Sequence, residues 1–378
     1  MAVIETRSSL NRLSSIDGLR GLAAIFVVFF HFYGALIEEL DRALPDAITI
    51  AFSYGYLGVP VFFVISGFVI ALSVGDRKVN KSYLGNFALR RSVRLDFTYW
   101  ASIILALCLI QLKNLYLGSN DPLPGASDLA LHLLYLQDIV GVDEDISVVY
   151  WTLCLEVQLY IFYITSLWGT QRLVGVERSY YVHLLGVTAL GLYSIMLDLN
   201  VLKFPFEGLF VSNWHYFLMG IMVCNVVRQK PYSTLILCSW LMIEILAQYL
   251  IIFKEYAIAG TACTFFIFLL WKLNAMERVF SSRILQYLGT LSYTIYLIHP
   301  DLGGKVIALG RELLGGELSG FSSVALFCIA VAVSVIVAHA LHVFVEKPSL
   351  RLSSRLKKER LRDIVRLKFH RLHRRFEG

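Results

Sequence analysis

The sequence predicts an all-α polytopic membrane protein with about ten transmembrane helices. Hydrophobic residues make up 57% of the 378 residues, charged residues only 16%, and the mean hydropathy is +0.66. Soluble domains carry about 25% charged residues, so this composition excludes a soluble fold. The six cysteines all lie in apolar runs without paired spacing, which indicates small buried side chains and no disulfide framework.

Apolar windows of bilayer length, about 20 residues, account for most of the chain. We expect one transmembrane domain over residues 1–345, because these windows leave no room for a separate soluble domain. Residues 346–378 alternate Arg and Lys with apolar residues at near-helical spacing, which predicts a basic, amphipathic cytoplasmic tail on the membrane surface. The ten windows lie near residues 19–37, 52–73, 97–117, 148–168, 180–198, 209–227, 232–249, 257–271, 284–301 and 321–345.

The distribution of Lys and Arg predicts the orientation. The expected inner segments hold 27 of these residues and the expected outer loops only 5. Basic residues accumulate on the cytoplasmic side, so both termini are expected in the cytoplasm. The net charge of +6 follows this asymmetry and gives no indication of nucleic-acid binding.

The first window carries two polar residues, Arg20 and His31, eleven positions apart. This spacing is three helical turns plus about 20°, so the two side chains share one face, about 16 Å apart along the axis. Ionisable residues inside a membrane are costly and mark candidate functional sites. The alternative is an anchor at the membrane edge for Arg20 and a helix–helix hydrogen bond for His31. The shared face favours function.

Two further windows carry polar residues. Glu156 lies about 12 Å below the outer end of the fourth window and His31 about 10 Å below that of the first, so we expect the two to be able to meet. A carboxylate at that depth is rarely inert. In the ninth window Tyr296 and His299 share one face, although His299 lies near the outer surface, where an interfacial role is the alternative.

The connection before the third window contains Arg91 and Arg94, which share a helix face because they are three residues apart. Guanidinium groups match phosphate oxygens, so the pair is a candidate phosphate clamp, and positive-inside anchoring is the alternative. In the second window Ser66 and Gly67 are small enough to let another helix approach closely.

These stretches together resemble the membrane-bound acyltransferase family 3, the group of O-antigen, exopolysaccharide and nodulation-factor O-acetylases. The matching segments follow the family order over residues 16–348, and they are IDGLRGLAAIFVVFFH, FFVISGFVI, RRSVR, WTLCLEVQLY, LSYTIYLIHP and FVEKP. Each motif is weak alone, whereas the ordered set is specific.

The resemblance implies ten helices, an acyl-CoA donor on the cytoplasmic side and a hydroxyl acceptor, usually a saccharide, on the outer side. It implies that His31 is essential and that Arg20, Arg91 and Arg94 help to hold the CoA phosphates. Glu156 matches the family's acid. The next position, often a second acid in the family, is Val157 here.

We therefore expect a multi-pass O-acyltransferase of the bacterial inner membrane, which moves an acyl group, most simply acetyl from acetyl-CoA, to a polysaccharide, lipopolysaccharide or glycolipid. His31 would be the general base, since an imidazole pKa near 6.5 suits that role, and Glu156 would orient it. Ser66, Trp151, Tyr296 and His299 are the expected substrate-binding residues, and no metal is expected.

Two alternatives are a small-molecule acceptor such as a macrolide, and a proton-coupled transporter or flippase in which His31, Glu156 and His299 relay protons. A transporter has no need of the arginine clamp. The sequence leaves open the acceptor, the acyl chain, the oligomeric state, the oxyanion-hole donors, and whether transfer is direct or passes through a covalent acyl-His31 intermediate.

Overall fold

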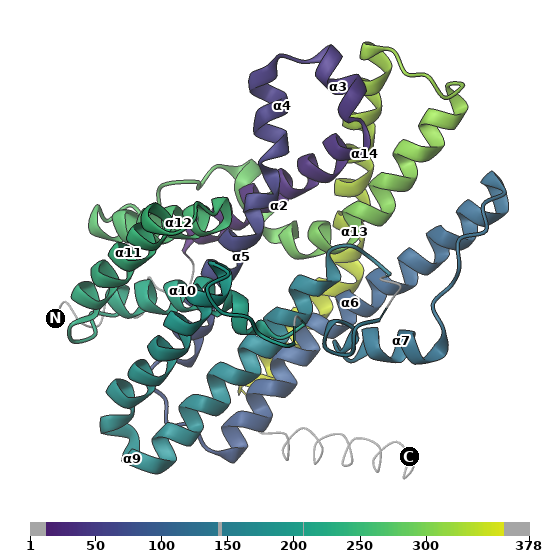
Figure 1. The fold of residues 1–378 in the computed structure, drawn as a ribbon. Coiled ribbons are helices and arrows are strands. Elements are labelled where there is room, and N and C mark those ends of the chain that lie inside the picture. Colours follow the sequence, from purple (N-terminus) through teal and green to yellow (C-terminus); the bar gives the residue numbers. More distant parts are fainter. Residues whose placement is uncertain (1–12, 143–145, 207, 359–378) are drawn as a thin grey trace, which may run out of the picture.

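The computed structural model describes residues 13–142, 146–206 and 208–358, and it is a bundle of helices (Figure 1). Helices account for 81% of the structure, and no strand occurs in the described ranges. Within the part of the chain that the structure describes, seven helices are long and apolar enough to cross a membrane. The predicted all-α membrane fold is therefore confirmed, whereas the count of ten spans and the side of each terminus stay predictions.

The helices follow the apolar windows in order. Each of the ten windows lies on one helix or on two or three successive helices. In chain order the elements are α2 (Ser14–Ala35), α3 (Ile37–Ala43), α4 (Asp46–Ser53), η1 (Gly55–Leu57), α5 (Gly58–Val74), α6 (Lys81–Leu117), α7 (Ala126–Leu133), α8 (Gln137–Val140), α9 (Tyr150–Asp198), η2 (Phe210–Asn213), α10 (Trp214–Val227), α11 (Ser233–Leu250), α12 (Glu255–Lys272), α13 (Arg283–Leu313), α14 (Gly320–Leu341), η3 (His342–Glu346) and α15 (Lys347–Lys358).

Helix α9 folds back on itself at Gly175. This glycine has φ +80° and ψ 165°, a conformation that side chains disfavour. Beyond it the chain reverses, because Ser166 Oγ lies 3.0 Å from His183 Nε2 and the Tyr163 and His183 rings are 5.5 Å apart. The windows at 148–168 and 180–198 thus form two antiparallel arms of one helical hairpin.

Small residues let the central helices touch. A Cβ added to Gly67 of α5 would lie 1.9 Å from the carbonyl oxygen of Phe217 in α10, and one added to Gly289 of α13 would lie 2.1 Å from that of Asp17 in α2. Such contacts bring backbones together as expected for helices in a bilayer. The close approach predicted at Gly67 is therefore present, and α2, α5 and α13 are fixed around the site described below.

The connections between helices lie at the two opposite ends of the bundle. At one end Ser15 N–H donates to Met276 O at 3.1 Å, and Val79 N–H donates to Gln171 Oε1 at 2.8 Å. These contacts join segments that the basic residues assign to the inner side. At the other end Arg311 pairs with Glu39 at 2.8 Å, joining two expected outer connections.

The bundle continues past residue 345. The carboxylate of Glu346 is buried and accepts hydrogen bonds from Thr294 Oγ1 at 2.6 Å and His342 Nδ1 at 2.8 Å. Helix α15 follows and is fixed to α6 by a bond from Ser353 Oγ to Arg90 O at 2.8 Å. The first part of the expected tail is therefore a packed helix, and the rest of it, from residue 359, lies outside the described residues.

Candidate active site

The site is a column of polar side chains from four helices that meet in the middle of the bundle. Helix α2 contributes Arg20, which lines a cavity together with residues of α5, α9 and α13, and His31, which contacts His299 of α13. Helices α9 and α13 contribute Glu156 and His299. The chain thus brings polar residues that are up to 279 positions apart into one region, and all of them come from predicted site motifs.

His31 and His299 form a direct pair near one end of this column. Nε2 of His299 lies 3.1 Å from Nδ1 of His31, and the two rings meet edge to face with centroids 4.9 Å apart. His299 is fully buried, whereas His31 is partly accessible. The two motifs that carry these histidines therefore build one unit.

The backbone assigns the protons of the pair. Nδ1 of His299 lies 3.1 Å from Ile295 O and 2.9 Å from Tyr296 O, and carbonyl oxygens only accept, so this nitrogen carries the proton and Nε2 accepts. Nδ1 of His31 then donates, with Val27 O at 2.9 Å and His299 Nε2 as its acceptors. Nε2 of His31 is the nitrogen left with a free lone pair.

A small cavity of about 60 Å³ lies next to the histidine pair, on the side where Arg20 is located. Its polar lining is contributed by α2, α5, α9 and α13, and two of its lining groups, Tyr296 OH and Thr152 Oγ1, form a hydrogen bond of 2.9 Å. Ligand pockets usually have at least about 300 Å³, so this cavity must widen before it can hold a substrate. The polar lining residues are Arg20, Ser66, Thr152, Glu156, Ser292, Tyr293 and Tyr296.

Glu156 is the centre of a second polar group in the same cavity. Its Oε1 accepts from Ser66 Oγ at 2.7 Å and from Tyr160 OH. The Arg91 guanidinium lies over the Tyr160 ring, 4.6 Å from its centroid, and is attracted by the Glu156 carboxylate. Helix α6 thus inserts an arginine of the predicted phosphate clamp into the bundle.

His31 and Glu156 were expected to be able to meet, but each of them hydrogen-bonds to other residues. Among the described residues, His31 hydrogen-bonds to Val27 and His299, and Glu156 to Ser66 and Tyr160. The expected depths of His31 and Glu156 were counted from the outer ends of their helices, and these two ends do not lie at the same height in the bundle.

The start of α9 lies inside the bundle. The ring of Tyr150, its first residue, packs 4.9 Å from that of Tyr99, and α6 continues for 18 residues, or about 27 Å, beyond Tyr99. Thr152 of α9 bonds to Tyr296 of α13, and the two helices run in opposite directions, so Glu156, one turn after Thr152, lies deeper than His299, one turn after Tyr296.

The remaining predicted residues fall at different distances from the pair. Tyr296 lies beside it, with its ring 6.0 Å from that of His299. Trp151 packs on the apolar Phe63, 6.5 Å between ring centroids, and does not line the central cavity. Arg94 lies within electrostatic range of Arg91.

Sequence reasoning missed one contributor to the site and one buried pair outside it. Tyr160 belongs to the predicted motif on α9, and its position four residues after Glu156 could have identified it as a partner. His342 and Glu346 are also four residues apart, but this signal lay at the expected boundary of the tail.

Aromatic rings continue the site towards the outer connections. The Phe30 ring lies 5.1 Å from His31 and 5.4 Å from Tyr56, and Tyr56 stacks on Tyr54 and Tyr256 at 6.3 and 5.6 Å. The hydroxyl of Tyr56 bonds to Glu255. Three stacked tyrosines with a carboxylate therefore lead from the connection between α4 and α5 to His31.

Comparison with known proteins identifies the family. The chain belongs to the membrane acyltransferase 3 family, because the model of its acyltransferase domain matches residues 13–343. The acyltransferase MdmB of Streptomyces mycarofaciens is 25% identical over 91% of this chain and 93% of its own length. A Staphylococcus aureus (strain COL) protein, named provisionally as an O-acetyltransferase, is 22% identical over 89% of this chain and 57% of its own length. No solved structure matches.

The family and the fold together define a multi-pass membrane O-acyltransferase. Membership favours the enzyme over the transporter that the buried histidines also suggested.

Proposed function

We propose that this protein transfers an acetyl group from acetyl-CoA on the cytoplasmic side to a saccharide hydroxyl on the outer side of a bacterial inner membrane. The observation that carries the proposal is the His31–His299 pair, which leaves one basic nitrogen beside a polar column that spans much of the bundle. The column offers a donor and an acceptor two opposite routes to the same imidazole.

His31 is the general base in this proposal. Nε2 of His31 takes the proton of the acceptor hydroxyl while its oxygen bonds to the thioester carbonyl carbon. The C–S bond then breaks, and the imidazolium returns the proton to the CoA sulfur. During the step Nδ1–H of His31 is held by Val27 O and His299 Nε2, so the ring keeps its orientation and the charged form has two acceptors.

Arg20 is the candidate for holding the donor near His31. Among the described residues no hydrogen bond or ion pair reaches its guanidinium, which lines the central cavity. Its N–H donors suit a thioester carbonyl, an amide of the pantetheine arm or a phosphate oxygen. Arg91 and Arg94 are expected to contribute positive charge along the same path.

Glu156 has a supporting role in this proposal. Its carboxylate holds Ser66 and Tyr160 and attracts Arg91, so it fixes the wall along which the donor arm would run. It is a positioning residue, and His299 takes the orienting role that the sequence assigned to Glu156.

The stacked tyrosines support a saccharide as acceptor. Sugar rings present C–H faces that pack on aromatic rings, and their hydroxyls bond to carboxylates such as Glu255. Tyr54, Tyr56 and Tyr256 offer both features, and Phe30 continues the surface to His31. The same surface would accept a glycosylated small molecule, so the acceptor has to be chosen by experiment.

The test is a thioester-cleavage assay with purified protein, acetyl-CoA and a panel of acceptors that includes oligosaccharides, lipid-linked saccharides and macrolides. The proposal expects free CoA thiol to appear in step with acetylated saccharide. Transfer only to a non-saccharide hydroxyl would replace the acceptor, and transfer from a donor other than acyl-CoA would contradict the donor.

A further inference from the structure

A second polar cavity lies at the end of the bundle that carries the basic connections, well away from His31. It has a volume of about 290 Å³ and lies between the two arms of α9 and the C-terminal end of α10. That volume is close to the lower limit for small-ligand pockets. Its polar lining residues include Asp76, Gln171, Tyr180, His183, Arg228 and Lys230.

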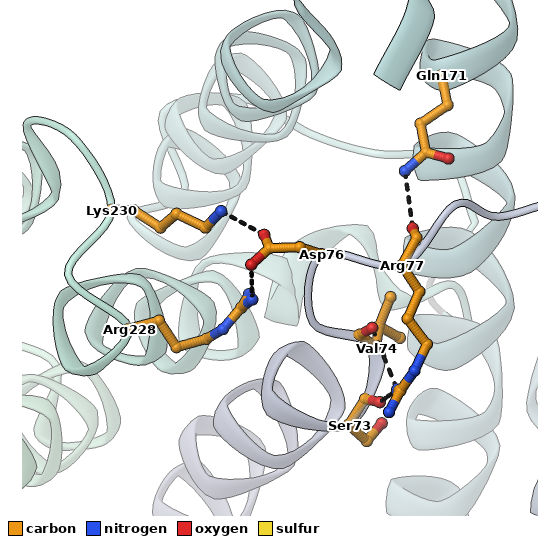
Figure 2. Close-up of polar contacts among 7 residues, drawn as sticks. All are labelled: Ser73, Val74, Asp76, Arg77, Gln171, Arg228 and Lys230. Carbon is orange, nitrogen blue, oxygen red and sulfur yellow. Dashed lines mark hydrogen bonds and ion pairs between the residues drawn. The ribbon is translucent and has the colours of Figure 1, made fainter. Parts of the chain in front are cut away.

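Two cations share one carboxylate at the mouth of this cavity. Figure 2 shows Asp76 between Arg228 and Lys230, each bonded to a different carboxylate oxygen. The Lys230 ammonium also lies 5.4 Å from the centroid of the Tyr180 ring. The pair of cations is therefore arranged to hold an anionic group through two oxygens.

The exposure of the three groups is unequal. The side chains of Arg228 and Lys230 are 16% and 22% exposed, whereas that of Asp76 is 66% exposed. Asp76 follows Gly75, which has φ +62°, on the connection between α5 and α6. The two cations are part of the cavity wall, whereas the Asp76 carboxylate is a surface group. The carboxylate can therefore move away from the cations and stay in water.

Both cations have unused hydrogen-bond donors. Among the described residues Arg228 bonds with its side chain only to Asp76, which leaves most of its five N–H donors free. In the same part of the chain, the only hydrogen bond of the Lys230 ammonium is to Asp76. The Tyr180 hydroxyl has no hydrogen-bond partner among the described residues. An anion with three or four oxygens would satisfy more of these donors than one carboxylate does.

We propose that Arg228 and Lys230 form a phosphate-binding site, in which Asp76 is the resident anion that a phosphate group displaces. The inference deepens the proposed function, on which it rests, by assigning the site to a phosphate of the CoA donor. The guanidinium fork suits phosphate oxygens.

Helix α9 connects the cavity to the catalytic column. Tyr163 lines the cavity, and Tyr160 and Glu156 follow it one and two turns further along the same face. From Tyr163 to Glu156 is about 10 Å along the axis. A ligand whose phosphates lie at Arg228 would thus have its flexible arm beside the wall that leads to Arg20 and Arg91.

The experiment measures CoA binding to the purified full chain, in detergent without anionic lipid. Arg228→Ala and Lys230→Ala should each weaken CoA binding about 10- to 100-fold, while pantetheine, which lacks phosphates, should bind all variants equally. Asp76→Asn should strengthen CoA binding, because the competing carboxylate is gone. Arg278→Ala, a basic residue of the same end outside the cavity, is the matched control.

A second arm identifies the source of the phosphate. If CoA binding is unchanged in both variants but phosphatidylglycerol vesicles retain the wild type better, the site binds a lipid phosphate. If neither probe distinguishes the variants from the wild type, the site is refuted while the proposed function stands. If the wild type itself fails to bind CoA, acyl-CoA is refuted as the donor of the proposed function. The vesicle comparison between wild type and variants then decides whether Arg228 and Lys230 bind a lipid phosphate.

Discussion

Two polar pairs that contain a histidine and contact α13 are built in opposite ways. His31 meets a neutral partner, His299, and keeps one ring nitrogen free. His342 meets a carboxylate, Glu346, at 2.8 Å, and the same oxygen accepts from Thr294 at 2.6 Å. The first pair joins α13 to α2, and the second joins it to the π-helical turn η3 after α14.

The difference separates a reactive group from a structural one. A carboxylate that holds a buried imidazole and a hydroxyl satisfies all three groups and fixes the helices that carry them. The neutral imidazole of His299 accepts a hydrogen bond from His31 and so fixes the orientation of the His31 ring. It leaves the other nitrogen of His31 able to take a proton. We therefore expect activity to depend on the first pair and stability on the second.

The largest effect is expected from His31→Ala. Loss of a general base costs about 100- to 10,000-fold in rate, so transfer should fall by that factor while acetyl-CoA still binds. His342→Ala is the matched control, because it removes an imidazole from the other pair, and it should keep most of the transfer rate per folded molecule. Equal losses in the two variants would break the contrast between the pairs.

A smaller loss is expected at His299. His299→Ala removes the acceptor that orients His31, which should lower kcat by about 10- to 100-fold. His299→Asn can still accept through its side-chain oxygen and should recover part of that loss, with KM little changed. A rise in KM at unchanged kcat would instead make His299 a substrate contact, as its motif first suggested.

The second pair should respond in stability. Glu346→Ala leaves His342 Nδ1 and the Thr294 hydroxyl without their partner, and each such buried group costs about 1–3 kcal/mol. Thermal unfolding in detergent should therefore shift down clearly, whereas the transfer rate of the remaining folded protein should be close to that of the wild type. A stable but inactive variant would place Glu346 in the chemistry.

The smallest effect concerns the exposed ion pairs of Asp76. Burial pushes the pKa of Asp76 upwards, but Lys230 and Arg228 outweigh it and hold the pKa below its usual 3.8. A lowered folded pKa stabilises the protein above pH 3.8, and this contribution is lost as the pH falls through the folded pKa. Because Asp76 is exposed, Asp76→Asn should cost less than about 1 kcal/mol at pH 7, and the difference from wild type should vanish once the pH lies below the lowered pKa of Asp76.

Much of the fold followed from periodicity and length, because membrane helices are continuous apolar runs. The hairpin of α9 could be anticipated only as two windows, since Gly175 lies in a segment without a strong turn signal. Residues that share a helix, such as Arg20 and His31, could be placed on one face from spacing alone. These predictions needed no knowledge of how the helices pack.

The sequence could not predict which side chains of different helices contact each other. His31 and Glu156 were matched by depth, but depth was counted from helix ends, and α9 starts far below the end of α6. His299 belonged to a recognised motif, yet nothing in its spacing indicated that it would meet His31. Register between helices is set by small-residue contacts such as that of Gly289, which a single sequence does not reveal.

The most direct test of His31 as the base is the pH dependence of kcat/KM in the wild type and in His31→Gln. Glutamine has a similar polar shape but does not titrate, and general-base catalysis makes kcat/KM rise with pH as the free base forms. We expect the wild type to rise with a slope of one and then level off, and the residual rate of His31→Gln to lack that ionisation. The same ionisation in both proteins would assign it to another group and contradict His31 as the base.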